Sequence, residues 1–399
     1  MPDKITISAV ICEFDPLHWG HLGLLEKAGA KGAAVCCVMS GNFLQRGAPA
    51  MLDKWSRTQC ALEAGADLVA ELPLSWACAG AERFAAGGVA LAGALGATHL
   101  YFGSEVPDPV LLLRLAQALL SPDFAQALRL QNQPGLPFAA RRQRAVEALL
   151  GPEAARPLAL PNATLGVEYC KAILSQGLAI QPVAVRRTGS GHGQQAPVEP
   201  GAVLSASQLR SLALQGRDLE GLVPGFTQAA LEEARAQGRF PAQIKHLERA
   251  ILCKLRGLTR EDFAALPGLS EGLEHRLAQA VGKACSLEEL YAQVKSKRYS
   301  HARVRRLVMG AFLGLEEPLP ALPPYLRLLG MNEKGGRVLS RRASDLPLAV
   351  RAGDFQKLSP AAQEGFRLEV RADDIYALAS PRPQPPGRDY WELFRKPLG

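Results

Sequence analysis

The chain has 399 residues, of which 48% are hydrophobic and 21% are charged, an ordinary globular composition with room for two or three domains. Its net charge of +8 lies almost entirely in the second half, where residues 216–399 hold 29 Lys and Arg against 22 Asp and Glu, and this asymmetry predicts a polyanionic partner. We expect no leader, membrane span, disulfide framework or zinc site, because no long apolar stretch occurs and the eight cysteines lack C-x-x-C spacing.

Apolar runs alternate with helical patterns over the first 105 residues. The runs predict buried strands at Ile5–Cys12, Ala33–Met39, Asp67–Leu72 and Thr98–Phe102. The intervening segments predict helices at Gly20–Ala30, Ser56–Ala64 and Ala81–Leu95. This order predicts a Rossmann-like α/β core with a parallel sheet covered on both faces. Right-handed crossovers would bring the loop after every strand to one edge of the sheet, where such folds bind ligands.

Helical periodicity dominates the rest of the chain. Residues 107–150 have a helical pattern, and another helix opens at Pro161 and includes Leu165–Leu174. A strand at Ile180–Val185 leads into an arginine pair, and a short helix capped by Ser205 follows. From about residue 216 to residue 314 the pattern is mainly helical, and beyond that it is mixed.

The loop after the first strand carries the strongest functional signal. It reads E-F-D-P-L-H-W-G-H and places His18, Gly20 and His21 where a helix should begin. A helix N-terminus offers unpaired N–H groups to phosphate, and two imidazoles there can donate to phosphate oxygens as pyrophosphate leaves. Gly20 would let a nucleotide lie against the backbone. The alternative, a surface His18 and a helix-capping His21, is less favoured directly after a strand.

Four further groups could contact phosphate, and each has a structural alternative. Ser205, Ser207 and Arg210 form a possible phosphate-binding corner at a helix start, although capped helices are common. Gly103 and Asn162 could contact the nucleotide, or Asn162 could only cap its helix. The polar loop after the second strand offers candidates for phosphate or acetate, or it is a solvated loop; the candidates are Ser40, Asn42, Arg46, Lys54 and Arg57.

A basic segment near residue 300 is the best candidate for RNA contact. Its six cations are interleaved with Tyr299 and His301, a pattern typical of phosphate contact combined with base stacking. A solvated helix face is the alternative. The six cations are Lys295, Lys297, Arg298, Arg303, Arg305 and Arg306.

The ordered motifs resemble those of the bacterial tRNA(Met) cytidine acetate ligases, which share the H-x-G-H motif of a nucleotidyltransferase superfamily. The resemblance rests on E-F-D-P-L-H-W-G-H, S-G-N-F-L-Q-R-G, D-K-W-x-R, F-G-S-E, R-R-x-G and S-A-S-x-L-R, and it extends over nearly the whole chain. It implies activation of acetate by ATP and transfer of acetyl to the N4 amine of the wobble cytidine of elongator tRNA(Met). Asp15 stands where the family commonly has Asn, which adds a negative charge near the phosphates.

The resemblance assigns roles by position. It implies a nucleotidyltransferase domain over residues 1–215 and a mainly helical, basic tRNA-binding region over 216–399. ATP is expected as co-substrate with Mg²⁺, without a metal site of the protein's own or a tight organic cofactor, in the cytoplasm and without a membrane partner. His18, His21 and Arg210 are the expected catalytic residues. The expected ATP contacts are Val10, Ile11, Cys12, Glu13, Phe14, Asp15, Pro16, Leu17, His18, Gly20, His21, Gly103, Asn162, Arg186, Arg187, Ser205 and Ser207.

Two other functions remain open from the residues alone. An adenylyltransferase acting on a small metabolite would use the first half but leaves the basic second half without a function. A non-catalytic RNA-binding protein with a nucleotide fold would use the basic segment, but it gives no reason for two histidines and Arg210.

Overall fold

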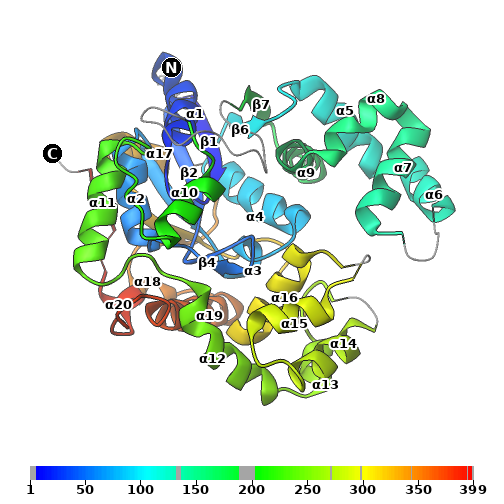
Figure 1. The fold of residues 1–399 in the computed structure, drawn as a ribbon. Coiled ribbons are helices and arrows are strands. Elements are labelled where there is room, and N and C mark those ends of the chain that lie inside the picture. The colour runs from blue at the N-terminus through cyan, green and yellow to red at the C-terminus, as the bar shows by residue number, and fades with distance from the viewer. Residues whose placement is uncertain are drawn as a thin grey trace.

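The computed structural model describes residues 6–131, 136–187, 203–269, 272–296, 299–342, 344–392 and 394–397. A seven-stranded sheet with the order β7-β6-β1-β2-β5-β8-β9 lies at its centre (Figure 1). Neighbours from β7 to β5 are parallel, and β8 pairs antiparallel with β5. The predicted parallel α/β sheet is therefore confirmed. The strands are β1 (Ile7–Cys12), β2 (Ala34–Ser40), β5 (Leu68–Leu72), β6 (His99–Ser104), β7 (Gln181–Arg186), β8 (Leu326–Met331) and β9 (Leu348–Ala349).

Helices cover both faces of the sheet, which is why its central strands are apolar without alternation. The side chains of adjacent Cys36 and Cys37 belong to opposite cores, because successive strand residues point to opposite faces. Val10 and Cys37 pack with α1 and α2, whereas Ala9 and Cys36 pack with α4 and α9. The four helices are α1 (Trp19–Gly29), α2 (Lys54–Glu63), α4 (Ala81–Ala94) and α9 (Pro161–Ser175).

Short elements and a helical lobe complete the first half. A hairpin of β3 (Phe43–Leu44) and β4 (Ala48–Pro49) follows β2, α3 (Leu74–Ala77) follows β5, and the 3-10 turn Ala30–Gly32 follows α1. The lobe packs on α9 through α5 and projects beside β6 and β7 (Figure 1). It consists of α5 (Pro109–Leu120), α6 (Pro122–Leu130), α7 (Phe138–Leu150), α8 (Pro152–Ala155) and the 3-10 turn Arg156–Ala159.

The second half shares cores with the first. Its largest apolar core includes Phe43, Leu74 and Cys78 from the first half, so the two halves are packed together. No helix in the part of the chain that the structure describes is long and apolar enough to cross a membrane. The helices are α10 (Ala206–Leu214), α11 (Gly225–Ala236), α12 (Ile244–Arg256), α13 (Arg260–Ala264), α14 (Leu273–Val281), α15 (Leu287–Val294), α16 (His301–Leu313), α17 (Glu333–Ser340), α18 (Ala352–Phe355), α19 (Pro360–Ala377) and α20 (Arg388–Trp391).

The sheet extends beyond residue 215. β8 pairs with β5, through contacts such as Leu68 opposite Met331, and β9 adds to β8. The second half is therefore helical for most of its length but also supplies two strands at one edge of the sheet. The division of function between residues 1–215 and 216–399 stays a prediction.

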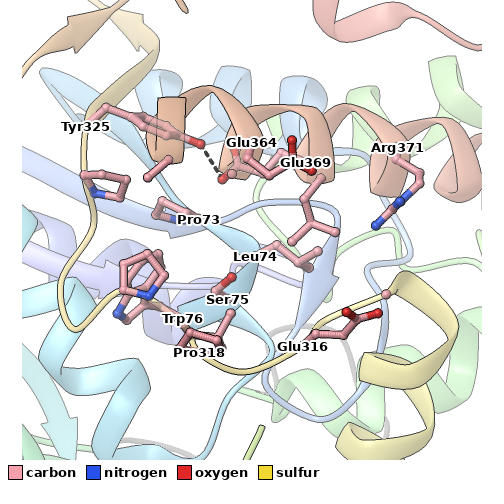
Figure 2. A pocket seen from close by; sticks show the side chains of 17 residues that line it. Pro73, Leu74, Ser75, Trp76, Glu316, Pro318, Tyr325, Glu364, Glu369 and Arg371 are labelled. Carbon is pink, nitrogen blue, oxygen red and sulfur yellow. Dashed lines mark hydrogen bonds between the residues drawn. The ribbon is translucent and has the colours of Figure 1, made fainter. Parts of the chain in front are cut away.

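A buried ionic cluster joins the sheet to the C-terminal helices. Lys54 of α2 lies 3.0 Å from a Glu71 oxygen of β5 and 2.8 Å from an Asp389 oxygen of α20. Arg327 of β8 contacts the same two carboxylates at 3.0 and 2.9 Å. We call Lys54, Glu71, Arg327, Glu369, Asp373 and Asp389 the ionic cluster. At its margin the Tyr325 hydroxyl donates to Glu369 of α19 at 2.7 Å, beside a cavity of about 330 Å³ (Figure 2).

Candidate active site

A cleft of about 620 Å³ opens at the carboxyl ends of β1, β6 and β7, next to the first turns of α1, α9 and α10. This is the edge of the sheet at which the sequence predicted a ligand. Of the predicted ATP contacts, Pro16 and Leu17 do not line the cleft, and Leu17 is buried in the core beneath α1. Those that line it are Val10, Ile11, Cys12, Glu13, Phe14, Asp15, His18, Gly20, His21, Gly103, Asn162, Arg186, Arg187, Ser205 and Ser207, and Arg46 and Arg210 line it as well.

The two histidines form a stacked pair at the start of α1. His18 is the N-cap, and its Nδ1 accepts a hydrogen bond from the Gly20 backbone N–H at 3.1 Å. Nδ1 of His21 accepts from the His18 backbone N–H at 3.4 Å. The ring centroids lie 3.7 Å apart with an angle of 21° between the planes. A Cβ at Gly20 would lie 3.0 Å from the His18 ring, so glycine permits this close approach.

Both imidazoles are neutral at physiological pH. Burial, together with the charges of Arg187 and Arg210, lowers the pKa of His18 to about 4. Burial, and then His18 and Arg187, lower the pKa of His21 well below its ordinary value. A neutral ring whose Nδ1 accepts a hydrogen bond carries its proton on Nε2. Each ring therefore carries its proton on Nε2, in a residue that lines the cleft.

We expect the His18 ring to stay neutral at mildly acidic pH. In an NMR titration of the histidine Cε1–H signals, the His18 signal should move with a midpoint near pH 4, because protonation adds a charge to a buried site next to two arginines. A His18→Asn variant assigns the signal. A midpoint between pH 6 and 7 would show that the ring is not buried beside those cations.

Asn162 and Arg187 are held together on the other side of the cleft. The Arg187 guanidinium donates to the Asn162 side-chain oxygen at 3.0 Å. The Glu105 carboxylate accepts from the Asn162 side-chain nitrogen at 2.6 Å and from the Ala163 backbone N–H at 2.8 Å. Glu105 thus caps α9 and fixes the Asn162 amide. The sequence suggested only that Gly103 and Asn162 could contact the nucleotide, and nothing in it marked Glu105 as the partner of a residue 57 positions later.

Asp15 does not leave an uncompensated negative charge near the phosphates. An oxygen of its carboxylate lies 2.7 Å from Arg46 and 3.9 Å from Arg210, and Arg210 also donates to the Asp15 carbonyl at 2.9 Å. Burial raises the pKa of Asp15, but Arg46 and Arg210 outweigh it, so the pKa is lowered overall. Asp15 is therefore ionised, and its carboxylate holds the Arg46 and Arg210 side chains in position at the cleft.

Four residues predicted to contact phosphate or acetate lie elsewhere. Lys54 belongs to the ionic cluster, and Asn42 bonds to Asp373 and to the Lys54 backbone N–H. Arg57 is buried and donates to the carbonyls of residues 13, 40, 41 and 52. Ser40 is fully buried. None of the four lines the cleft, so only Arg46 of this group remains a candidate for ligand contact.

The predicted RNA-binding cations are divided between two places. Lys295 and Arg305 are exposed, and Arg303 is half-buried. Arg306 instead lines the cleft at the edge of the sheet, together with Ala302 one turn earlier on α16. Gly47 contacts the α16 backbone next to Arg306, where a Cβ would lie within 2.6 Å of it. Lys297 and Arg298 lie outside the described residues.

Comparison with known proteins agrees with this geometry. The chain matches the family described as HIGH Nucleotidyl Transferase over residues 5–389. The tRNA(Met) cytidine acetate ligase of Acetivibrio thermocellus is 34% identical over an alignment that covers 94% of this chain and 96% of that protein. That of Syntrophotalea carbinolica is 35% identical, with 93% and 94% covered. The chain belongs to the tRNA(Met) cytidine acetate ligase family.

Solved structures of this family have the same fold. TmcAL of Thermotoga maritima in its apo form I has a TM-score of 0.92 at 28% identity and covers 98% of this chain and 100% of that one. The same protein bound with alpha-thio ATP in form II has a TM-score of 0.90 over the same coverage. The match extends over α10 to α20 as well as the sheet, so the association of the two halves belongs to the family fold.

Proposed function

We propose that this protein is an ATP-dependent acetate ligase that acetylates the N4 amine of the wobble cytidine of elongator tRNA(Met). The observation that carries the proposal is the pair of neutral imidazoles at the start of α1, in a cleft with Arg46, Arg187 and Arg210. The names of the relatives and the nucleotide held by the Thermotoga maritima structure support the substrates.

The first step suits a site that is rich in donors. Acetate is ionised at neutral pH, so one of its oxygens can attack the α-phosphorus without a general base. The new O–Pα bond forms as the bond from Pα to the bridging oxygen breaks, and pyrophosphate leaves with the electron pair. The Nε2–H groups of His18 and His21 and the arginines donate to the oxygens on which charge accumulates. The first turn of α1 adds its backbone N–H groups and its partial positive charge.

The second step is a transfer from a mixed anhydride. The N4 amine attacks the acetyl carbonyl carbon, a C–N bond forms, and the C–O bond to phosphate breaks. AMP leaves with the electron pair, and one amine proton is released. Acetyl-adenylate is an activated acyl donor, so orientation of the two reactants supplies much of the rate.

Magnesium would enter with the triphosphate in this proposal. Mg²⁺ keeps several waters and is commonly held by substrate phosphates with one or two carboxylates. Of the two carboxylates that line the cleft, Asp15 is already paired with Arg46, and Glu13 accepts a hydrogen bond from the Gln45 backbone N–H at 2.7 Å. No group of three or more His, Cys, Asp or Glu side chains suited to a metal occurs within the described ranges. The donors therefore fit an ion that ATP carries, which supplies charge neutralisation at the leaving pyrophosphate.

Two assays on the full chain test the proposed function. ATP–pyrophosphate exchange should require acetate, and labelled acetate should enter elongator tRNA(Met) only when ATP is present. A tRNA with uridine at the wobble position is the matched control and should stay unlabelled. Exchange that ignores acetate but responds to another small metabolite would favour the adenylyltransferase alternative. Tight tRNA binding without any exchange would favour a non-catalytic RNA-binding protein.

Charge reversal at the exposed cations should weaken tRNA binding selectively. A Lys295→Glu, Arg305→Glu variant should bind tRNA about 10-fold more weakly at 150 mM salt and show a shallower salt dependence, because fewer counterions are released. Acetate-dependent exchange should be unchanged, since neither residue lines the cleft. A gel-shift titration at several salt concentrations measures the effect. Equal affinity of variant and wild type for tRNA would show that tRNA binds to another surface of the protein.

A further inference from the structure

A second cavity of about 370 Å³ adjoins the nucleotide cleft. One wall is the start of α4, with Gly80 as its N-cap and Arg83 in its first turn, and another wall is α16, with Arg303 and Arg306. Arg306 lines both this cavity and the nucleotide cleft, so its side chain stands between them. Gly80 also directly precedes Ala81, which lines the cleft. The cavity and the cleft are therefore adjacent both at α16 and at the start of α4.

We propose that this cavity receives the acceptor nucleoside, an unstacked cytidine of single-stranded RNA, and holds its amine toward the acetyl-adenylate in the cleft. The inference rests on the proposed function and adds the place of the second substrate. Enzymes that modify one base bind it out of the stack in a pocket beside the reacting atoms. A cavity that shares a wall with the adenylate site satisfies that requirement.

Two of the three cations of this cavity, Arg303 and Arg306, have no carboxylate partner among the described residues, whereas Arg83 lies within the electrostatic reach of Glu317, which also lines the cavity. Arg306 is half-buried, and its Nη1 donates to the Gln45 carbonyl at 3.3 Å. Arg303 donates through Nη2 to the Gly268 carbonyl at 2.8 Å. Neither guanidinium forms an ion pair with a carboxylate of the described residues, and burial lowers the pKa of Arg306. A half-buried guanidinium with no anionic partner and with spare N–H donors can bind a ligand that supplies acceptors.

The side chains that line the cavity can bind the faces of a cytosine and its O2 and N3 atoms while leaving its N4 amine unbound. Leu266, Leu307 and Leu315 provide an apolar surface for the flat faces of a base. Cytosine carries two adjacent acceptors, O2 and N3, and guanidinium groups present paired donors or stack on base faces. The exocyclic N4 amine is a donor and gains nothing from an arginine, so it remains free to react. The nearby ribose phosphates would add acceptors for the same cations.

Filling the cavity from Gly80 tests the proposal. A Cβ at Gly80 would meet no atom within 4 Å, and the backbone φ is −66°, so a leucine is sterically tolerated at this position of the cavity lining. Gly80→Leu should reduce acetylation of tRNA by about 100-fold, because the amine can no longer reach the acyl carbon. Acetate-dependent ATP–pyrophosphate exchange should stay at the wild-type rate. Gly353→Leu, at an exposed glycine that also has no atom within 4 Å, is the matched control for both assays.

Fluorescence of the wobble base reports directly on whether the protein unstacks it. Elongator tRNA(Met) with a fluorescent cytidine analogue at the wobble position should brighten when wild-type protein unstacks the base, and Gly80→Leu should abolish this change. Arg303→Met, on the wall away from the nucleotide cleft, should weaken it. Normal acetylation by Gly80→Leu would overturn the proposal. Loss of exchange in both variants would overturn it too, since the cavity would then belong to acetate activation. Failure of the wild type itself to exchange or acetylate would instead reject the proposed function.

Discussion

Replacing His21 with alanine should reduce acetate-dependent ATP–pyrophosphate exchange by about 10²–10³-fold, the usual effect of losing one preorganised donor to developing charge. The variant loses the Nε2–H of His21 and also the ring that stacks on His18 at 3.7 Å and packs against Phe14 at 5.1 Å. The His18 ring would then lack the stacking contact that holds it in place. Exchange with labelled pyrophosphate at saturating ATP and acetate measures the effect.

Binding of tRNA separates this result from general damage. The affinity of His21→Ala for tRNA should match that of the wild type, because the histidine lies in the cleft rather than with Lys295 and Arg305. His21→Asn keeps an N–H donor of similar reach and should recover part of the rate. His275→Ala, at an exposed histidine, is the matched control. Wild-type exchange in His21→Ala would mean that ATP binds elsewhere.

The sequence predicts the sheet and the first loop well because their signals are local. Near-continuous apolar runs bounded by glycine and proline indicate buried parallel strands, and every strand predicted before residue 105 is present within two residues at either end. The H-x-G-H histidines lie at the cleft because a loop that follows a parallel strand must emerge at one edge of the sheet. Ser205 and Arg210, nearly 190 residues away, reach the same edge for the same reason.

The sequence does not reveal how a cation is used when its partner is distant in the chain. Lys54 has the local appearance of a phosphate ligand, but Asp389, 335 residues later, is one of its partners. The Arg57 guanidinium donates its hydrogen bonds to backbone carbonyls that only the folded chain brings together. Arg306 has the pattern of a solvated basic helix, yet α16 packs against Gly47 and Arg306 lines the cleft at the edge of the sheet. Strand β8 was missed for a similar reason, since its partner β5 lies more than 250 residues earlier.

Replacing Lys54 with methionine should lower the free energy of unfolding by about 3–5 kcal/mol, the cost of removing one partner from a buried ion pair. Burial and Arg327 each lower the pKa of Lys54, but Asp373, Asp389 and Glu71 outweigh them and raise it above its ordinary value. Without the ammonium, Arg327 alone would face the Glu71 and Asp389 carboxylates. Urea unfolding at pH 7.5 measures the loss. Arg367→Met, which breaks an exposed pair with Glu364, should cost less than about 1 kcal/mol.

The dependence of this loss on pH distinguishes an electrostatic cause from a packing defect. Burial raises the pKa of Asp389, but Arg327 and Lys54 outweigh it and hold the pKa below its ordinary value, so the carboxylate stabilises the folded wild type above about pH 4 and that contribution fades as the pH falls. In Lys54→Met the uncompensated carboxylates can take up protons, which removes the buried negative charge. The difference in unfolding free energy between wild type and variant should therefore be smaller at pH 5 than at pH 7.5. A difference that stays constant or grows on acidification would show that Lys54 acts through its packed side chain rather than through its charge.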